Sequence, residues 1–238
     1  MGETFVLVHG AWHGAWCWEA VASILGGRGH HVTTPCLTGV GERAGELSPN
    51  ITLETFAADV TAHLEQQGLS DVTVVGHSFA GGPVSAAAER CAERVKRLIY
   101  LDATFLAPGE TPLSRSPPDV IAARRRLAEE SSSGLSLPPP APEHLGITDP
   151  AQAAWVSARM TPHPFNTFVT PLDLDRKPAS QHPADYIWVT APEYLPLIAS
   201  RERVRERGLA MHPLATGHDA MVTAPQALTD LLETLARQ

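Results

Sequence analysis

The chain has 238 residues, of which 43% are hydrophobic and 18% are charged, and its formal net charge is −8. This length suffices for one large α/β domain or two small ones, with enough core to fold without disulfides or a structural metal. The negative charge argues against nucleic acid as a partner, and no apolar run approaches the roughly 20 residues of a membrane span.

Short apolar runs alternate with helical patterns along the first 106 residues. The segment 51–68 is the clearest helix, because Phe56, Val60 and Leu64 recur on one face and Gly68 stops it. Strands that alternate with helices indicate a parallel sheet with helices on both faces. In this part of the chain we predict strands over 4–10, 30–37, 72–77 and 95–103, and helices over 16–26, 51–68 and 79–93.

The pattern breaks after residue 106 and resumes near residue 184. Residues 107–183 contain 14 of the 21 prolines, together with RRR, SSS and PPP runs. Such a block indicates an inserted lid over one end of the sheet, between two core segments, 1–106 and 184–238. The second core segment completes a sheet of about six mostly parallel strands. Its predicted elements are strands over 186–192 and 208–215 and helices over 194–207 and 224–236.

The stretch GHSFAGG, residues 76–82, connects a predicted strand to a predicted helix. Parallel sheets bind ligands at the carboxyl ends of their strands, and a sharp strand–turn–helix exposes a serine there. Ser78 could instead be a simple helix cap, but the flanking strand and helix favour a nucleophile. Ala80 adds one methyl group where the usual pattern has glycine. We expect the turn to accept it, provided the backbone there does not need a positive φ.

A serine nucleophile needs a base, and the base needs a carboxylate that orients it. His218 lies in the predicted loop between the last strand and the last helix, where it can reach Ser78. Two carboxylates compete for the third position. Glu193 follows the strand at 186–192 and is slightly favoured, whereas Asp102 ends the strand at 95–103.

The loop HGAWHGAWCW, residues 9–18, follows the first strand. It would bring the Ala11 N–H to the reaction centre, where it forms an oxyanion hole with the N–H of Phe79. Trp12 and His13 from this loop, and Trp155 and Phe168 from the lid, are the candidate substrate-binding residues.

Taken together, these segments resemble the α/β-hydrolase superfamily. FVLVHGAWHGAWCW is similar to the subgroup of plant methylesterases, hydroxynitrile lyases and bacterial pyrethroid-type carboxylesterases, and PCLTGVGER and TGHDAMVTAP look most like the carboxylesterases. The resemblance covers about residues 4–105 and 184–235 and implies Ser78 as nucleophile, His218 as base, and Ala11 and Phe79 as amide donors. The subgroup's acid position falls at Pro192, so the acid has moved or been replaced.

The resemblance implies hydrolysis of a small or apolar carboxylic ester through an acyl-enzyme. The lyases place a threonine at the position of Ala11 and a lysine at that of Asp219, so cyanohydrin cleavage is disfavoured. Alternatives on the same scaffold are a thioester, lactone or C–C hydrolase and a biosynthetic tailoring enzyme. A binding module without turnover is an alternative of another class.

The remaining features of the sequence concern cofactors, partners and location. No metal cluster, phosphate loop or dinucleotide fingerprint is present, so no cofactor or metal is expected. The expected partner is a small-molecule ester, with no nucleic acid or membrane, and the oligomeric state stays open, with a homodimer as one option. Three cysteines without paired spacing, and no basic-then-apolar leader before the first strand, predict a cytoplasmic protein with reduced thiols.

Overall fold

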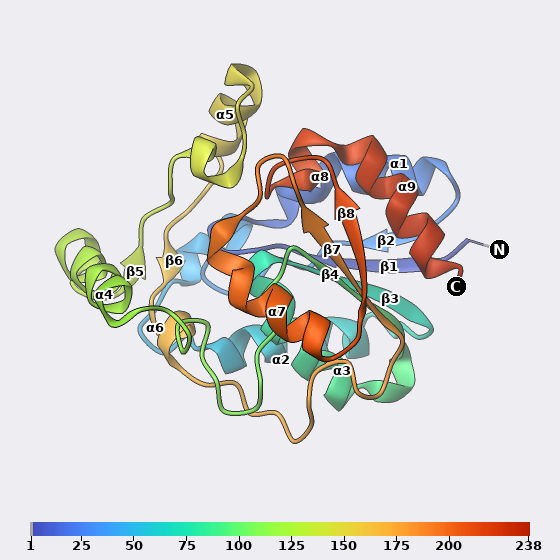
Figure 1. Cartoon of the computed structure of the whole chain (residues 1–238), viewed down its shortest axis with the longest axis horizontal. Coiled ribbons are helices and arrows are strands. Elements are labelled where there is room, and N and C mark those ends of the chain that lie inside the picture. The colour runs from blue at the N-terminus through green and yellow to red at the C-terminus, as the bar shows by residue number, and fades with distance from the viewer. Residues whose placement is uncertain (1) are drawn as a thin grey trace.

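The computed structural model describes residues 2–238 and contains a six-stranded parallel sheet, as predicted. The strand order is β2-β1-β3-β4-β7-β8, and each neighbouring pair is parallel. The carboxyl ends of the strands therefore share one edge (Figure 1). The strands are β1 (Thr4–Val8), β2 (His31–Thr33), β3 (Val72–His77), β4 (Val95–Leu101), β7 (Ala184–Val189) and β8 (Ala210–Leu214).

Helices cover both faces of this sheet. Alternate residues of β1 point to opposite faces, so that Phe5 belongs to one hydrophobic core and Val6 to the other. On the Phe5 face lie α1 (Glu19–Gly27), α8 (Ala220–Thr223) and α9 (Pro225–Ala236), and on the Val6 face lie α2 (Leu53–Gln66), α3 (Gly81–Arg90) and α7 (Ile198–Glu206). Short 3₁₀ turns occur at Ala15–Trp18, Gly41–Glu46, Ser78–Ala80, Ala92–Arg94, Pro142–Leu145 and Leu195–Leu197.

The predicted strand at 30–37 is much shorter in the structure than the sequence suggested. β2 is an edge strand of three residues, and its chain leaves the sheet before Pro35. Pro has no N–H to donate to a ladder, which explains why pairing stops there. Beyond this point the Leu37 N–H donates to His9 Nε2 at 3.1 Å, so the chain is held by a side chain instead.

The register of β3 and β4 positions two candidate catalytic residues. His77 pairs with Leu101 at the carboxyl ends of these neighbouring strands. Ser78 follows β3 and Asp102 follows β4, so these two residues leave the sheet side by side. Both residues have positive φ, 53° and 38°, so both turns are sharp.

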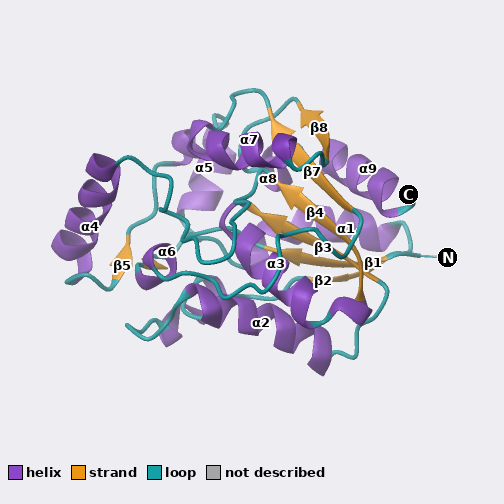
Figure 2. Cartoon of the chain, turned by 60° about the horizontal axis from the view of Figure 1, so that its bottom comes forward, coloured by secondary structure: helices purple, strands orange, loops and turns teal. Residues whose placement is uncertain are grey.

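Most of residues 107–183 lie beyond this carboxyl edge, and residues 173–183 return along α3 to the amino end of β7 (Figure 2). They contain α4 (Pro118–Ser132), α5 (Pro150–Ser157) and α6 (Asn166–Val169), together with a small antiparallel pair, β5 (Ser136–Leu137) and β6 (His163–Pro164). Among residues 2–238, no helix combines the length and apolar character that crossing a bilayer requires.

Candidate active site

Ser78 occupies a tight turn between β3 and the helix α3. Its φ of 53° is left-handed, which costs a non-glycine residue roughly 1–2 kcal/mol. The close approach of strand and helix needs Gly76, because a Cβ there would lie 2.6 Å from Val84 Cγ2. Ala80 has an ordinary helical φ of −67° and is fully buried, so its methyl group fits as expected.

The structure brings His218 to Ser78 and Asp102. The Ser78 hydroxyl donates to His218 Nε2 at 2.8 Å, and His218 Nδ1–H donates to Asp102 Oδ2 at 2.7 Å. Asp102 is fully buried and His218 nearly so. This order of hydroxyl, imidazole and carboxylate can activate the serine oxygen and stabilise the imidazolium that forms.

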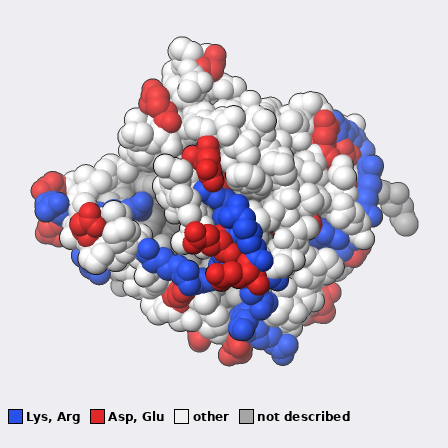
Figure 3. Space-filling model, viewed as in Figure 1, with Lys and Arg blue, Asp and Glu red and all other residues white. Residues whose placement is uncertain are grey.

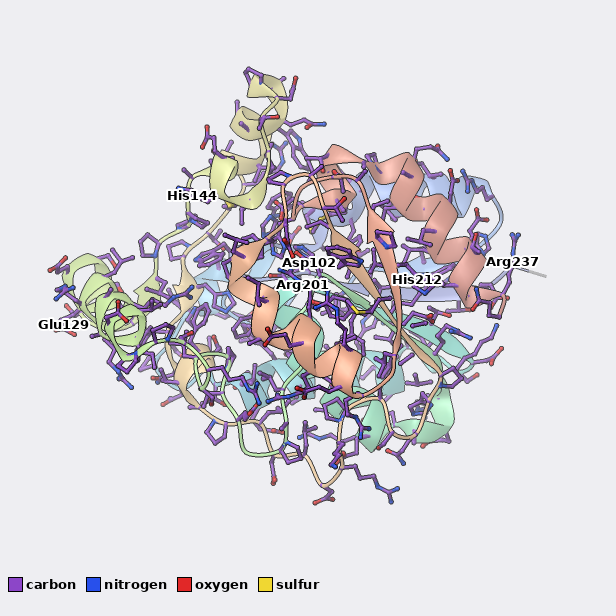
Figure 4. The ribbon with its side chains drawn as sticks, in the orientation of Figure 1. Asp102, Glu129, His144, Arg201, His212 and Arg237 are labelled. Carbon is purple, nitrogen blue, oxygen red and sulfur yellow. The ribbon has the colours of Figure 1, made fainter. Side chains whose placement is uncertain are left out.

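Glu193 does not contact His218, and the slight preference for it is therefore corrected. Its side chain is 43% exposed and pairs with Arg201 Nη2 at 3.1 Å. The same guanidinium reaches Asp102 Oδ1 through Nη1 at 3.2 Å, so Arg201 separates the two carboxylates. Figure 4 shows Arg201 and Asp102 meeting at the centre of the molecule. Arg201 has no distinguishing feature in the arginine-rich segment 201–207, which explains why the sequence did not reveal it.

A second buried carboxylate, Asp219, lies behind His218. His13 Nε2–H donates to Asp219 Oδ2 at 2.9 Å, and His13 Nδ1–H donates to Ala11 O at 2.7 Å. Burial alone would lower the pKa of His13, but the charge and hydrogen bond of Asp219 outweigh burial and raise it. The same pair lowers the pKa of Asp219 in spite of its burial. His13 is thus a buried ion-pair residue, which corrects its prediction as a substrate-binding residue.

The neutral histidine His77 completes this buried layer. His77 Nε2–H donates to the His218 carbonyl oxygen at 3.0 Å, and burial holds the pKa of His77 well below its usual value. Among residues 2–238, His77, His218 and Asp219 form the one group with ligand atoms close enough for a metal ion. Both ring nitrogens of His218 are already bonded to Ser78 and Asp102, so this group gives no argument for a metal.

A cavity of about 540 Å³ opens beside Ser78. The predicted residues Ala11, Trp12, Phe79 and Phe168 line it, and so does Tyr194, whose ring stacks on His218 at 3.7 Å. In the part of the chain described by the structure, no hydrogen bond uses the Ala11 N–H. That N–H is therefore free to bind an oxyanion.

Trp155 does not line this cavity, which corrects its predicted contact with substrate. Its ring meets Trp16 edge-on at 5.1 Å within a small core that includes Leu145 and Ile147. Its place is taken by α4 and by the residues that precede it, which form much of the cavity wall. The space-filling view shows a hollow between α4 and the main body of the molecule (Figure 3).

The segment 107–183 is hydrogen-bonded to the loop that carries Ala11. The Trp12 N–H donates to His163 Nδ1 at 3.2 Å, and the Thr161 N–H donates to the Trp12 carbonyl at 2.9 Å. Phe168 packs against Phe79 with ring centroids 4.9 Å apart. These contacts fix the aromatic wall of the cavity against the strand edge that carries Ser78.

Comparisons with known proteins find similarity along most of the chain. The sequence profile described as the alpha/beta hydrolase family matches residues 5–231. The carbendazim-hydrolyzing esterase of Nocardioides sp. (strain SG-4G) is 34% identical, over 97% of this chain and 98% of its own length. The pyrethroid hydrolase of Sphingobium wenxiniae is 36% identical, over 45% of this chain and 38% of its own length.

Solved structures resemble the whole chain. An extracellular α/β-hydrolase from a Paenibacillus species, described as sharing homology with tobacco salicylic acid binding protein 2, has a TM-score of 0.85 and 25% identity, covering 99% of this chain and 100% of its own. Tomato methylketone synthase I has a TM-score of 0.82 at 18% identity, covering 100% of this chain and 98% of its own, and it shows the shared fold alone.

Proposed function

Because the chain belongs to the alpha/beta hydrolase family, we propose that it hydrolyses a carboxylic ester through an acyl-enzyme formed on Ser78. The observation that carries this proposal is the hydrogen-bonded series from Ser78 through His218 to Asp102, with distances of 2.8 and 2.7 Å. The similarity to an esterase over nearly the full length of both chains supports the same chemistry.

In the first half of the reaction, Ser78 Oγ attacks the ester carbonyl while His218 Nε2 takes the hydroxyl proton. The carbonyl oxygen becomes an oxyanion, which the N–H groups of Ala11 and Phe79 bind. Asp102 holds the imidazole in its tautomer and balances its positive charge. The tetrahedral intermediate then expels the alcohol, which receives the proton from His218, and the acyl group stays on Ser78.

In the second half, water takes the place of the alcohol. His218 removes a proton from the water as it attacks the acyl carbonyl, and the second tetrahedral intermediate releases the acid and restores the Ser78 hydroxyl. The aromatic wall of Trp12, Phe79 and Phe168 suits an apolar group next to the scissile bond. No cofactor takes part in these steps.

The proposal is tested with a fluorophosphonate probe and a panel of 4-nitrophenyl and methyl esters. We expect the probe to label Ser78 and the wild type to hydrolyse some of the esters. Ser78→Ala should abolish both labelling and turnover without changing the fold. Ser85→Ala is the matched control, because Ser85 is a buried serine of α3 that binds Tyr100 and does not line the cavity. Turnover by Ser78→Ala within tenfold of wild type would contradict the proposal.

A further inference from the structure

The catalytic cavity contains a basic residue that the proposed chemistry does not use. Arg124 extends from α4 and lines the same cavity as Ser78. Its guanidinium carbon lies 5.5 Å from the centre of the Phe168 ring, over the ring face. Phe168 in turn packs against Phe79, which follows Ser78. An aromatic surface thus connects the guanidinium to the nucleophile.

The other arginines of the cavity wall have carboxylate partners. Arg203 Nη2 donates to Glu110 Oε1 at 2.8 Å, and Arg115 Nε lies 3.5 Å from the same oxygen. Arg124 differs from both, because no carboxylate among residues 2–238 lies within 4.0 Å of its guanidinium. The remaining acidic residue of the wall, Glu202, is exposed on α7 and likewise has no partner within that distance.

This environment favours an anion from outside the chain. Partial burial lowers the pKa of Arg124, yet a guanidinium keeps its charge in proteins. A partly desolvated cation without a counterion is unfavourable, whereas its planar fork of N–H groups matches a carboxylate in two parallel hydrogen bonds. The Phe168 ring packs against the face of the guanidinium but has no hydrogen-bond acceptor for its N–H groups.

We propose that Arg124 binds a carboxylate on the substrate, so that the preferred substrates are esters carrying an anionic group at the end distant from the scissile bond. The inference rests on the proposed ester hydrolysis at Ser78 and specifies its substrate class. The apolar wall of Trp12, Phe79 and Phe168 accepts the chain between the two groups. A half-ester of a dicarboxylic acid has this arrangement of ester, apolar spacer and carboxylate.

The test compares mono-4-nitrophenyl esters of dicarboxylic acids, from succinate to suberate, with the neutral 4-nitrophenyl alkanoates of the same length. We expect Arg124→Gln to lower kcat/KM for the best anionic ester by roughly 10- to 100-fold, the usual value of a charge-assisted pair, and to leave the neutral ester within about threefold. Arg124→Lys keeps the charge but loses the fork and should fall in between.

Arg125→Gln is the matched control, since Arg125 lies over Phe165 on the same helix but does not line the cavity. It should change neither ester. For each protein, kcat/KM for the anionic ester is divided by kcat/KM for the neutral ester. If this ratio is the same in the wild type and in Arg124→Gln, the inference is wrong, although the proposed ester hydrolysis still holds.

A binding measurement separates this inference from the proposed function. Glutarate and suberate half-esters are titrated into Ser78→Ala and into Ser78→Ala/Arg124→Gln, with tryptophan fluorescence as the signal because Trp12 lines the cavity. We expect binding that the second variant weakens by at least tenfold. Equal affinity in the two variants, or no binding to Ser78→Ala, would overturn the subsite even if the wild type cleaves none of the esters.

Discussion

Arg201 Nη1 donates to Asp102 Oδ1 at 3.2 Å, while the other oxygen of this carboxylate accepts from His218. Both Arg201 and Asp102 are almost entirely buried. Two partners on two oxygens hold the carboxylate in one orientation and so fix the imidazole that faces Ser78. This arrangement explains how a carboxylate at the end of β4 can accept the hydrogen bond from His218 Nδ1–H in a fixed orientation.

Asp102→Asn should lower kcat on one good ester by about 10⁴-fold, because the imidazole loses its countercharge and its orientation. Glu193→Gln should lower kcat by less than tenfold, since Glu193 is largely exposed and contacts only Arg201 of this group. Steady-state kinetics of both variants check this. A large loss in Glu193→Gln with a small loss in Asp102→Asn would contradict the assignment.

Arg201→Gln should lower the free energy of unfolding by about 3–5 kcal/mol, because it leaves the buried Asp102 charge without its guanidinium partner. Urea unfolding followed by circular dichroism measures this change. Arg205→Gln, an exposed arginine of the same helix, is the control and should stay within about 0.5 kcal/mol of wild type. If Arg201 also positions the Asp102 carboxylate, the folded Arg201→Gln protein should show a larger change in kcat than in KM.

Ser78→Gly should be inactive and yet more stable than Ser78→Ala by about 1 kcal/mol. Glycine adopts the φ of 53° without strain, whereas alanine keeps a Cβ in the same left-handed conformation. Thermal unfolding of the two variants under identical conditions is the comparison to make. If Ser78→Gly is the less stable of the two, the turn does not store strain at this residue.

The ion pair of His13 and Asp219 should make stability depend on pH in a defined window. The pKa of His13 is raised, so its contribution is full below about pH 6.5, the unfolded value, and is lost as pH rises through the folded pKa. The pKa of Asp219 is lowered, so its contribution is full above about pH 3.9 and is lost as pH falls through the folded pKa. The pair therefore stabilises most between about pH 4 and about pH 6.5.

Urea unfolding of the wild type and Asp219→Asn across this range measures the effect. We expect the difference in unfolding free energy to be largest inside the window and to shrink above it. The wild type also contains buried neutral histidines such as His9, whose pKa of about 4 adds its own acid destabilisation, but that term cancels in the difference. A difference that does not change with pH would contradict the ion pair.

Trp12→Ala should raise KM for apolar esters several-fold, because Trp12 forms part of the cavity wall. Trp155→Ala should leave KM unchanged and instead reduce the free energy of unfolding by about 1–3 kcal/mol, because its partly buried ring packs against Trp16. Ester kinetics and unfolding on both variants separate these roles. An equal effect on KM would place Trp155 in the cavity after all.

The alternating pattern of the sequence predicted the sheet well because buried parallel strands are continuous apolar runs, such as 72–77. The loop positions of Ser78 and His218 followed from the order of these strands. The acid could not be decided in the same way, because Asp102 and Glu193 both follow strand ends and only the side-chain geometry distinguishes them.

The buried pairs were beyond the reach of the sequence for a different reason. Arg201 meets Asp102, and His13 meets Asp219, across large separations in the chain. Local patterns in the sequence do not predict contacts between residues that are so far apart in the chain. The segment 107–183 posed the same difficulty: its aromatic residues are conspicuous in the sequence, but only tertiary packing places Phe168 in the cavity wall and Trp155 against a separate core.

The cavity wall is divided between two parts of the chain. Ser78, Asp102 and His218 all lie outside residues 107–183, whereas Arg124 and Phe168 lie within them. This inserted segment leaves the sheet after β4 and rejoins it at the neighbouring strand β7. Exchange of this segment between relatives would therefore change the residues that contact the substrate and leave Ser78, His218 and Asp102 in place, provided that the new segment keeps the hydrogen bonds of Thr161 and His163 to Trp12.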